Sequence, residues 1–266
     1  MQTRGWMVLL TLVPSVAEAQ VNAEVLRPNP FRAGLSGGLE GSLALARGNI
    51  ELFDLGGAGR VQYQTLHPAT SSTALPFVAQ RIFLAANGRF ADRSGVAFIS
   101  QGFVHARWTG MWHPRIGSDL FAQYQFNEFL RLTGRAIVGA GLRAELIHEP
   151  VFMLWAGSGY LFEYDRINVL PGATDPAETY EHRLTNYLTA RLALLSDRLW
   201  LQSTTYLQPR FDAPSDYRAL TELELLLKIN EALGLGNTLS LLYDSAPPTG
   251  VVRSDLRLFS TLRWSF

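Results

Sequence analysis

The stretch RSDLRLFSTLRWSF, residues 253–266, decides how the rest of the chain is interpreted. Alternate positions carry charged or polar side chains, namely Arg253, Asp255, Arg257, Thr261, Arg263 and Ser265. The positions between them are apolar, namely Leu256, Leu258, Leu262, Trp264 and Phe266. Ser254, Phe259 and Ser260 interrupt the alternation. Because successive side chains of a strand point to opposite faces, the pattern predicts a strand that separates two different environments.

The chain stops on an aromatic residue, with a second aromatic residue two positions earlier. A last strand that ends in Phe resembles the terminal strand of outer-membrane barrels of Gram-negative bacteria, in which the assembly machinery recognises that terminus. The resemblance implies that Leu262, Trp264 and Phe266 form the assembly signal. A soluble strand with one apolar face is the alternative. The membrane interpretation is favoured because alternation of this kind is what lipid-facing strands show.

Composition narrows the classes of partner and chemistry. The 266 residues suffice for one large β domain or two small ones. The formal net charge is zero, so neither nucleic acid nor an anionic lipid surface is indicated as a general partner. No cysteine is present, which excludes disulfides, thiolate chemistry and a lipidated N-terminal cysteine. The five histidines lack metal-ligand spacing, and we predict neither a metal site nor a cofactor.

The first nineteen residues have the features of an export signal. Arg4 supplies a positive charge, residues 6–13 form a short apolar core, and Ala17-Glu18-Ala19 is a small-residue cleavage site. The apolar core is too short to cross a bilayer as a helix. We therefore expect a signal peptide at residues 1–19, a polar periplasmic lead-in at 20–33 and a barrel at 34–266.

About twelve segments of the mature chain alternate between polar and apolar residues. Each is near or above the ~9–11 residues that a tilted strand needs to cross the hydrocarbon. Turn signals such as Arg47-Gly48-Asn49 and Asn87-Gly88 separate them. The sequence therefore predicts an all-β fold, an antiparallel up-and-down transmembrane barrel of about twelve strands. An even number of strands places both ends on the periplasmic side. The long linkers at Asn168, Asp212 and Ala246 are then external, and the linker 66–76 is periplasmic.

Lipid also explains why the sheet is expected to close. An exposed sheet edge in hydrocarbon leaves backbone N–H and C=O groups unpaired, at several kcal/mol each. Aromatic residues near strand ends fit an interfacial belt, as for Trp108, Tyr124, Tyr160, Tyr164 and Trp200. Tyr187 is an exception, because its place in the alternation puts it in the lumen.

Two glycine-rich stretches resemble a known family. They are SGGLEGSLALARGN at residues 36–49 and RAIVGAGLRAE at 135–145, the latter with Gly139 and Gly141. Together with the following strand through Tyr164-Asp165, they are similar to the salt-stress-induced outer-membrane proteins, a family that carries a domain of unknown function. The likeness covers most of the mature chain and implies an outer-membrane barrel. It implies no catalytic residues, because that family has no established activity.

Charged residues at inward positions are the candidate lumen lining. They are Arg60, Arg107, Arg135, Arg143, Glu145, Glu163, Arg183, Arg191, Glu222, Glu224 and Lys228, with Glu40 at the same parity. Buried charges are tolerated only when paired, so the set predicts either a salt-bridge network that fills the barrel or a narrow charged channel. About eight strands enclose little more than side chains, whereas about sixteen hold water. We expect a monomer, surrounded by outer-membrane lipid, that is structural or passes small hydrophilic solutes.

An outer-membrane lipid hydrolase is the enzymatic alternative, because one class of twelve-stranded barrel is a phospholipase. The His and Ser of that class face lipid and lie close together in sequence. Here His105 has inward parity, the nearby Ser100 has outward parity, and no His-x-Ser element occurs. We therefore predict no catalytic residues. A soluble periplasmic β-sandwich is the third alternative, and it predicts extraction without detergent.

Overall fold

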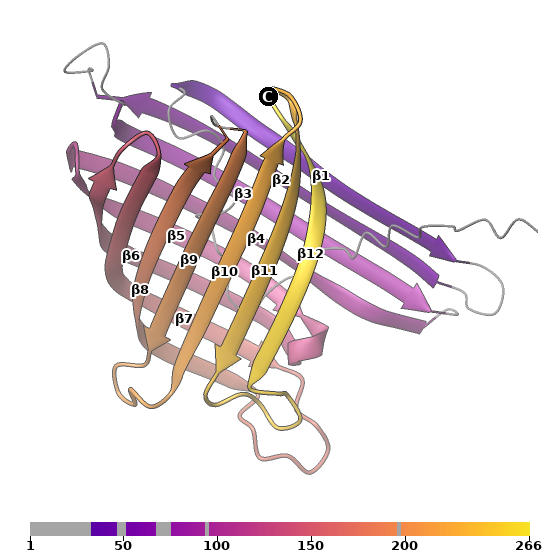
Figure 1. Cartoon of the computed structure of the whole chain (residues 1–266). Helices are drawn as coiled ribbons and strands as arrows, with labels where there is room; N and C mark the ends of the chain where they lie inside the picture. The colour runs from indigo at the N-terminus through magenta and orange to yellow at the C-terminus, as the bar shows by residue number, and fades with distance from the viewer. Residues whose placement is uncertain (1–32, 47–51, 68–75, 94–95, 196–197) are drawn as a thin grey trace, which may run out of the picture.

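The computed structural model describes residues 33–46, 52–67, 76–93, 96–195 and 198–266. These residues form a closed antiparallel barrel in which each strand pairs with its sequence neighbours and β12 pairs with β1 (Figure 1). The strands are β1 (Gly34–Ala46), β2 (Leu52–Leu66), β3 (Val78–Arg93), β4 (Val96–His113), β5 (Ile116–Asn127), β6 (Leu132–His148), β7 (Phe152–Ile167), β8 (Glu178–Leu194), β9 (Leu199–Pro209), β10 (Tyr217–Lys228), β11 (Leu233–Asp244) and β12 (Ser254–Ser265). The predicted all-β barrel of about twelve strands is confirmed.

One 3-10 helix, η1 (Glu128–Leu130), follows β5 in the described chain. None of the helical residues described is part of a helix long and apolar enough to cross a membrane.

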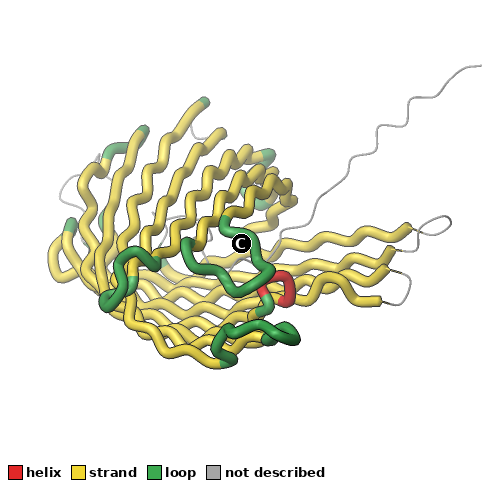
Figure 2. Tube along the Cα trace, turned by 90° about the horizontal axis from the view of Figure 1, so that it is seen from below, coloured by secondary structure: helices red, strands yellow, loops and turns green. Residues whose placement is uncertain are grey.

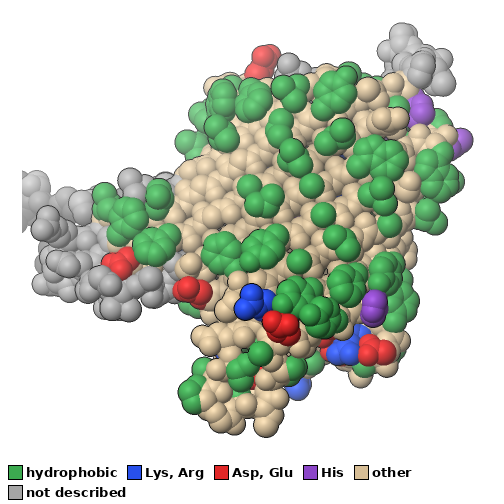
Figure 3. All heavy atoms as spheres, turned by 180° about the vertical axis from the view of Figure 1, so that it is seen from behind, with side chains coloured by type: hydrophobic (Ala, Val, Ile, Leu, Met, Phe, Trp, Pro, Cys, Tyr) green, Lys and Arg blue, Asp and Glu red, His purple; other side chains and the backbone are tan. Residues whose placement is uncertain are grey.

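The two faces of each strand meet different surroundings. In β10, Arg218, Glu222 and Glu224 point into the barrel and are buried, whereas Leu223 and Leu225 point outward and are exposed. Among the described residues, buried polar side chains outnumber buried apolar ones about two to one. Figure 3 shows apolar side chains spread over the outer surface, with charged ones gathered mainly at its lower edge. This distribution is the reverse of a water-soluble fold, and it suits a barrel with lipid outside.

The turn predicted at Asn87-Gly88 is wrong. Strand β3 runs through both residues, and Gly88 lies opposite Gly57 of β2 and Gly102 of β4. Asn-Gly favours a tight turn locally, but ladders on both sides hold the segment extended. Strand β3 continues to Arg93, and β4 begins at Val96. The turn predicted at 47–49, the signal peptide and nearly all of the lead-in lie outside the described residues.

The long connections gather at one end of the barrel, here called the loop end. It is formed by residues 128–131, 168–177, 210–216 and 245–253, and it lies opposite the C-terminus (Figure 1). Figure 2 is seen from the side of this end. The other end, here called the terminus end, carries Phe266 and the start of β1. The three long linkers expected to share a side therefore do so, and β2 ends and β3 begins at the other end.

The barrel closes through a short seam between β1 and β12. These strands are in register only at Gly38, Leu39 and Glu40, and Gly37 and Phe266 exchange two backbone hydrogen bonds of 3.1 Å. By contrast, β12 pairs with β11 over eleven positions and β1 with β2 over thirteen. Beyond the seam the two strands diverge (Figure 1). The β1–β12 junction therefore has the fewest pairs in the described wall.

Candidate functional site: the charged lumen

Arginines and carboxylates fill the lumen toward the loop end. Five guanidinium groups and seven carboxylates are joined there by ion pairs, and we call them the loop-end network. Its members are Arg131, Arg135, Arg183, Arg210, Arg218, Glu163, Asp165, Asp175, Glu181, Asp212, Asp216 and Asp244. All except Arg131 and Asp175 form one connected set. The strands that supply most of it are β6, β7, β8, β10 and β11.

Arg218 lies at the centre of this network. Its guanidinium donates to Glu163 Oε1 at 2.5 Å and to Asp244 Oδ2 at 3.0 Å. Arg135 makes a bidentate pair with Asp165, at 2.7 and 2.5 Å. The Glu163 side chain is only 1% exposed, so its charge depends on these arginines. Arginine suits the position because its planar fork matches two carboxylate oxygens.

The network reaches the mouth of the barrel through Arg183 and Arg210. Arg183 pairs with Glu181 at 2.5 Å and with Asp216 at 3.0 Å. Arg210, just beyond β9, contacts the same two carboxylates and makes a bidentate pair with Asp212. The hydrogen bonds with Asp212 raise the pKa of Arg210, and those from Arg210 lower the pKa of Asp212. Both groups are therefore charged at neutral pH.

Two loops are joined over the mouth by Arg131 and Asp175, an arrangement we call the clasp. Arg131, at φ +56°, donates to Asp175 Oδ2 at 3.2 Å, to Asn168 O at 2.7 Å and to Thr249 O. The amide and hydroxyl of Thr249 both donate to Asp175 Oδ1 at 3.0 Å. The hydrogen bond donated by the Thr249 backbone amide is the main cause of the lowered pKa of Asp175. The clasp thus connects loops 168–177 and 245–253.

A cavity of about 230 Å³, here called the vestibule, lies among these groups. Charged side chains line one part of it, namely Arg135, Asp165, Asp175, Glu181, Arg210, Asp216, Arg218 and Asp244. Apolar side chains line the rest, including Leu130, Leu132, Ile167, Leu242, Pro247, Pro248 and Val251. The vestibule therefore offers both charge and apolar surface to a small solute.

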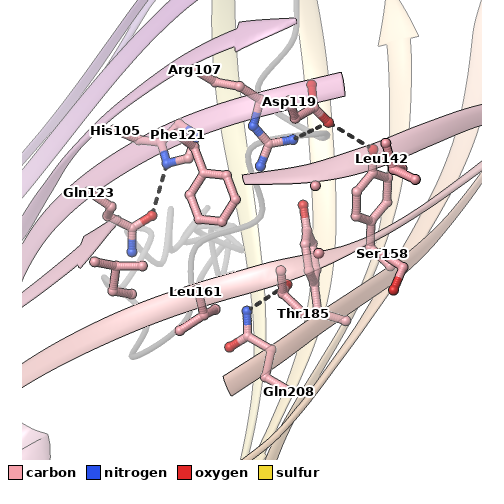
Figure 4. A pocket seen from close by; sticks show the side chains of 15 residues that line it. His105, Arg107, Asp119, Phe121, Gln123, Leu142, Ser158, Leu161, Thr185 and Gln208 are labelled. Carbon is pink, nitrogen blue, oxygen red and sulfur yellow. Dashed lines mark hydrogen bonds and ion pairs between the residues drawn. The ribbon is translucent and has the colours of Figure 1, made fainter. Parts of the chain in front are cut away.

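Deeper in the barrel, hydrogen bonds cross the lumen. Tyr187 Oη on β8 donates to Asp119 Oδ2 on β5 at 3.1 Å, and Arg143 Nη1 donates to Tyr187 Oη at 3.1 Å. We call these three residues the mid-lumen bridge. Asp119 also accepts from Thr109 Oγ1 at 2.5 Å. It faces Arg107 at 3.8 Å (Figure 4). A smaller cavity of about 40 Å³ lies here.

Glycines on β6 and β7 make room for the aromatic rings at this depth. A Cβ atom at Gly157 would lie 2.2 Å from the Tyr187 ring, and one at Gly139 would lie 2.3 Å from the Phe121 ring. Any larger residue would push these rings farther into the lumen. The two glycines therefore help to set the width of the barrel interior at the mid-lumen bridge.

Tryptophans and cations meet inside the terminus end. The Arg191 guanidinium lies 3.9 Å from the Trp200 ring centroid, and Lys228 Nζ lies 5.3 Å from it. Arg143 lies 5.4 Å from the Trp155 centroid. The assignment of Trp200 to the outer aromatic belt is therefore wrong. Its position shares parity with the buried Gln202 and Thr204, so the ring points inward and is buried.

Most of the predicted lumen residues are placed on the inner face. Eight are buried, namely Arg60, Arg107, Arg135, Arg143, Glu163, Arg183, Glu222 and Glu224. Glu145 and Arg191 are half-buried, and Lys228 is exposed at the terminus end. Of the predicted lumen residues, only Arg135, Glu163 and Arg183 belong to the loop-end network. Glu145 instead lies 3.0 Å from His148 Nδ1.

Arg60 and Glu224 belong to a separate group beside the seam. Arg263 donates to Glu40 Oε1 at 2.9 Å and to Glu224 Oε1 at 2.5 Å, and Arg60 pairs with Glu40. We call Glu40, Arg60, Glu224 and Arg263 the seam network. It connects β2, β1, β12 and β10 with two charges of each sign.

Sequence reasoning missed several members of the site, among them Asp119, Asp165, Glu181, Arg218 and Asp244. Their inward parity was available as a signal, since Asp165 shares a face with Glu163 and Arg218 with Glu222. The candidate assembly residues lie on the outer face, where Leu262, Trp264 and Phe266 are all exposed. The Trp264 and Phe266 rings lie 5.2 Å apart.

Two histidines bear on the hydrolase alternative. His105 points inward, where its Nδ1 lies 3.0 Å from Gln123 Oε1 (Figure 4). On the outer face, Ser158 Oγ donates to Asn186 at 2.8 Å, but the His182 ring contacts Tyr160 Oη at 2.6 Å. His182 pairs in register with Phe162, four residues beyond Ser158. Neither the His105 nor the His182 imidazole is therefore placed to activate Ser158.

These features define the class of a transmembrane β-barrel with a charged lumen, as in outer-membrane barrels. The chain belongs to the family described as "Protein of unknown function, DUF481", whose model matches residues 40–266. That description carries no salt-stress name, so this part of the resemblance stays a prediction.

Three solved structures illustrate the similarity of fold. The NanC porin matches with a TM-score of 0.44 at 7% identity, covering 87% of this chain and 98% of that one. The KdgM porin matches with a TM-score of 0.41 at 10% identity, covering 87% and 99%. The translocator domain of the autotransporter NalP from Neisseria meningitidis matches with a TM-score of 0.45 at 10% identity, covering 91% and 90%. At this level of similarity no functional property is transferred. Curated proteins gave no significant match.

Proposed function

We propose that this protein is an outer-membrane barrel that forms a narrow channel for small hydrophilic solutes. The observation that carries the proposal is the polar lumen, which holds the vestibule at the loop end and a second cavity, lined by both polar and apolar side chains, at mid-depth. A barrel that served only as a structural wall could fill its interior with apolar side chains. Buried charges are tolerated when they are paired, as those of the loop-end network are, and a path for hydrated solutes is a reason to keep them.

The mid-lumen bridge is the proposed constriction. It joins β5 to β8 across the interior, and the Arg143 guanidinium adds bulk on the same side. Its groups are held by hydrogen bonds to strands of the wall, so the opening left beside them is narrow. We therefore expect a small conductance and exclusion of bulky solutes.

Single-channel recording on the purified protein tests this role. Tyr187→Ala removes the bridging ring and should increase the conductance steps, whereas Tyr187→Phe keeps the ring and removes only the hydroxyl. Tyr180→Ala is the matched control, because Tyr180 lies on the same strand and faces outward. Absence of conductance in both the natural protein and Tyr187→Ala would leave a structural role and end the channel proposal.

The cellular setting is part of the proposal. We propose the outer membrane of a Gram-negative cell as the location, reached after removal of residues 1–19, with the barrel inserted as a monomer. Exposure of Leu262, Trp264 and Phe266 on the outer face supports recognition by the assembly machinery. Deleting Phe266 should reduce the amount in the outer-membrane fraction, and recovery of folded protein from the aqueous periplasm would contradict the location. Induction by salt remains a prediction, which transcript levels after osmotic upshift would test.

A further inference from the structure

We propose that the vestibule binds small organic cations, with a preference for amines that carry a short aliphatic part. This inference rests on the proposed channel function and deepens it, because it names the class of solute that the loop end selects.

The charge balance of the loop-end network favours cations. Its ion pairs join seven carboxylates to five guanidinium groups, which leaves two negative charges in excess when all are ionised. The seam network is balanced, with two charges of each sign. A cavity with low-dielectric walls concentrates such an excess and raises the local concentration of counter-ions. Of these two networks, only the loop-end network therefore carries an excess of negative charge.

The pairing within the vestibule favours cations as well. Arg135 is bidentate to Asp165, Arg218 spans Glu163 and Asp244, and Arg210 is bidentate to Asp212. Guanidinium groups engaged in this way are held by the protein's own carboxylates. A carboxylate, in contrast, has about four lone-pair sites and can accept further hydrogen bonds. An ammonium group entering the vestibule can therefore bind Asp216 or Asp244 without displacing an arginine.

The remaining lining indicates an organic cation rather than a metal ion. Within the described ranges, no group of three or more Asp, Glu or His side chains has the geometry to hold a metal. Leu132, Ile167, Leu242 and Val251 instead present apolar surface beside the carboxylates. At about 230 Å³, the cavity is smaller than the ~300–1,000 Å³ typical of drug-sized ligands. A short alkyl amine satisfies the charge, the apolar surface and the volume together.

Equilibrium binding to the detergent-solubilised full chain is the first test. The probe is 1,4-diaminobutane, compared by calorimetry with the neutral 1,4-butanediol and the anionic succinate. We expect binding of the diamine, with clearly weaker binding of the other two. Asp216→Asn and Asp244→Asn should each weaken diamine binding by roughly 3–10-fold, since each removes one charge from the cavity. Glu178→Gln is the control, because Glu178 is exposed at the loop end and does not line the vestibule.

Folding and function can be separated in this design. Two aspartate variants are used so that one may fail to fold without ending the test, and unfolding curves identify such a failure. Ion selectivity in a KCl gradient is measured on the same proteins. Diamine binding without conductance would contradict the channel and support the vestibule site. Conductance with equal binding of diamine and diol, or with anion selectivity, would overturn the site and leave the channel. Tighter binding of Ca²⁺ than of the diamine would overturn the organic class.

Discussion

The wall of this barrel is joined in two different ways. Between β6, β7 and β8 each junction has fifteen register pairs, and the loop-end network adds ion pairs on its inner face. Between β1 and β12 only three register pairs exist, and the seam network spans the junction. Backbone pairing therefore holds the strands together between β6, β7 and β8. Side-chain ion pairs contribute a larger part of the contact between β1 and β12.

The difference shows that buried charge has two uses in one lumen. At the loop end, fifteen register pairs hold each of the β6–β7 and β7–β8 junctions, and the arginines there both neutralise buried carboxylates and line the vestibule. At the seam, Arg263 and Glu40 reach across a junction that the backbone leaves mostly unpaired. Removing a charge should therefore have local consequences at the seam and broader ones at the centre of the loop-end network, where each arginine contacts several carboxylates.

The largest effect is expected from Arg218→Met. The change leaves Glu163, Asp165 and Asp244 without their shared partner in a buried site. Removing one partner of a buried ion pair costs about 3–5 kcal/mol. Denaturant unfolding in detergent measures this loss. The stability of Arg218→Lys should fall between that of the natural protein and that of Arg218→Met, because lysine restores the charge without the planar fork of arginine. Unchanged stability of Arg218→Met would contradict the central position of this arginine.

The next effect separates the two faces of one strand. Leu225→Arg should impair assembly, because an arginine facing mid-bilayer in a barrel costs about 2–4 kcal/mol. Glu222→Leu, three residues away and inward, should alter conductance or thermal unfolding with little effect on insertion. Heat-dependent gel mobility of membrane fractions measures folded barrel in both variants. Indistinguishable behaviour of the two would mean that the assignment of faces in β10 is wrong.

The seam is tested by Glu40→Gln. This change removes the carboxylate that Arg60 and Arg263 share. Hydrogen bonds to charged groups contribute about 1.5–3 kcal/mol, and the loss should appear first at the seam because few backbone pairs support it. Amide exchange at Gly37 and Phe266 should become faster, while exchange along β6 and β7 stays the same. Equal acceleration in both regions would show that the seam is no weaker than the rest of the wall.

Much of this architecture could be predicted from the sequence, because period-two alternation assigns each residue to a face. The barrel, its number of strands and the inward charges follow from that pattern. The depth of a side chain in the lumen and its position around the barrel do not follow from the pattern, because alternation indicates only which face a residue is on. The hydrogen bond between Tyr187 and Asp119 joins residues far apart in the chain. No feature of the sequence near either residue indicates this contact. The short seam is likewise a property of closure, which no single segment contains.

Local signals also misled where tertiary structure decided otherwise. Asn87-Gly88 has the composition of a tight turn, yet two neighbouring strands keep it extended. Trp200 sits near a strand end, as a belt residue would, but its parity places it against Arg191 in the lumen. For Trp200, the alternation of the whole strand was the stronger signal, whereas for Asn87-Gly88 the pairing on both sides decided the conformation.

The smallest effect is expected at the clasp, which joins exposed loops and should leave the wall unaffected. Asp175→Ala removes the acceptor of the Thr249 amide, so exchange of that amide should become faster while thermal unfolding stays the same. Asp212→Ala is the control, because it removes a carboxylate bound to Arg210 at the same end.

The pKa of Asp175 is lowered in the folded protein, so the stabilisation that ionised Asp175 gives to the clasp is complete above the ordinary aspartate range and disappears as the pH falls through the lowered value. The clasp should therefore persist at neutral pH and loosen only in strong acid, and Thr249 exchange measured against pH, after correction for the intrinsic rate, checks this. Loosening of the clasp between pH 6 and 8 would assign the loop contact to a group other than Asp175.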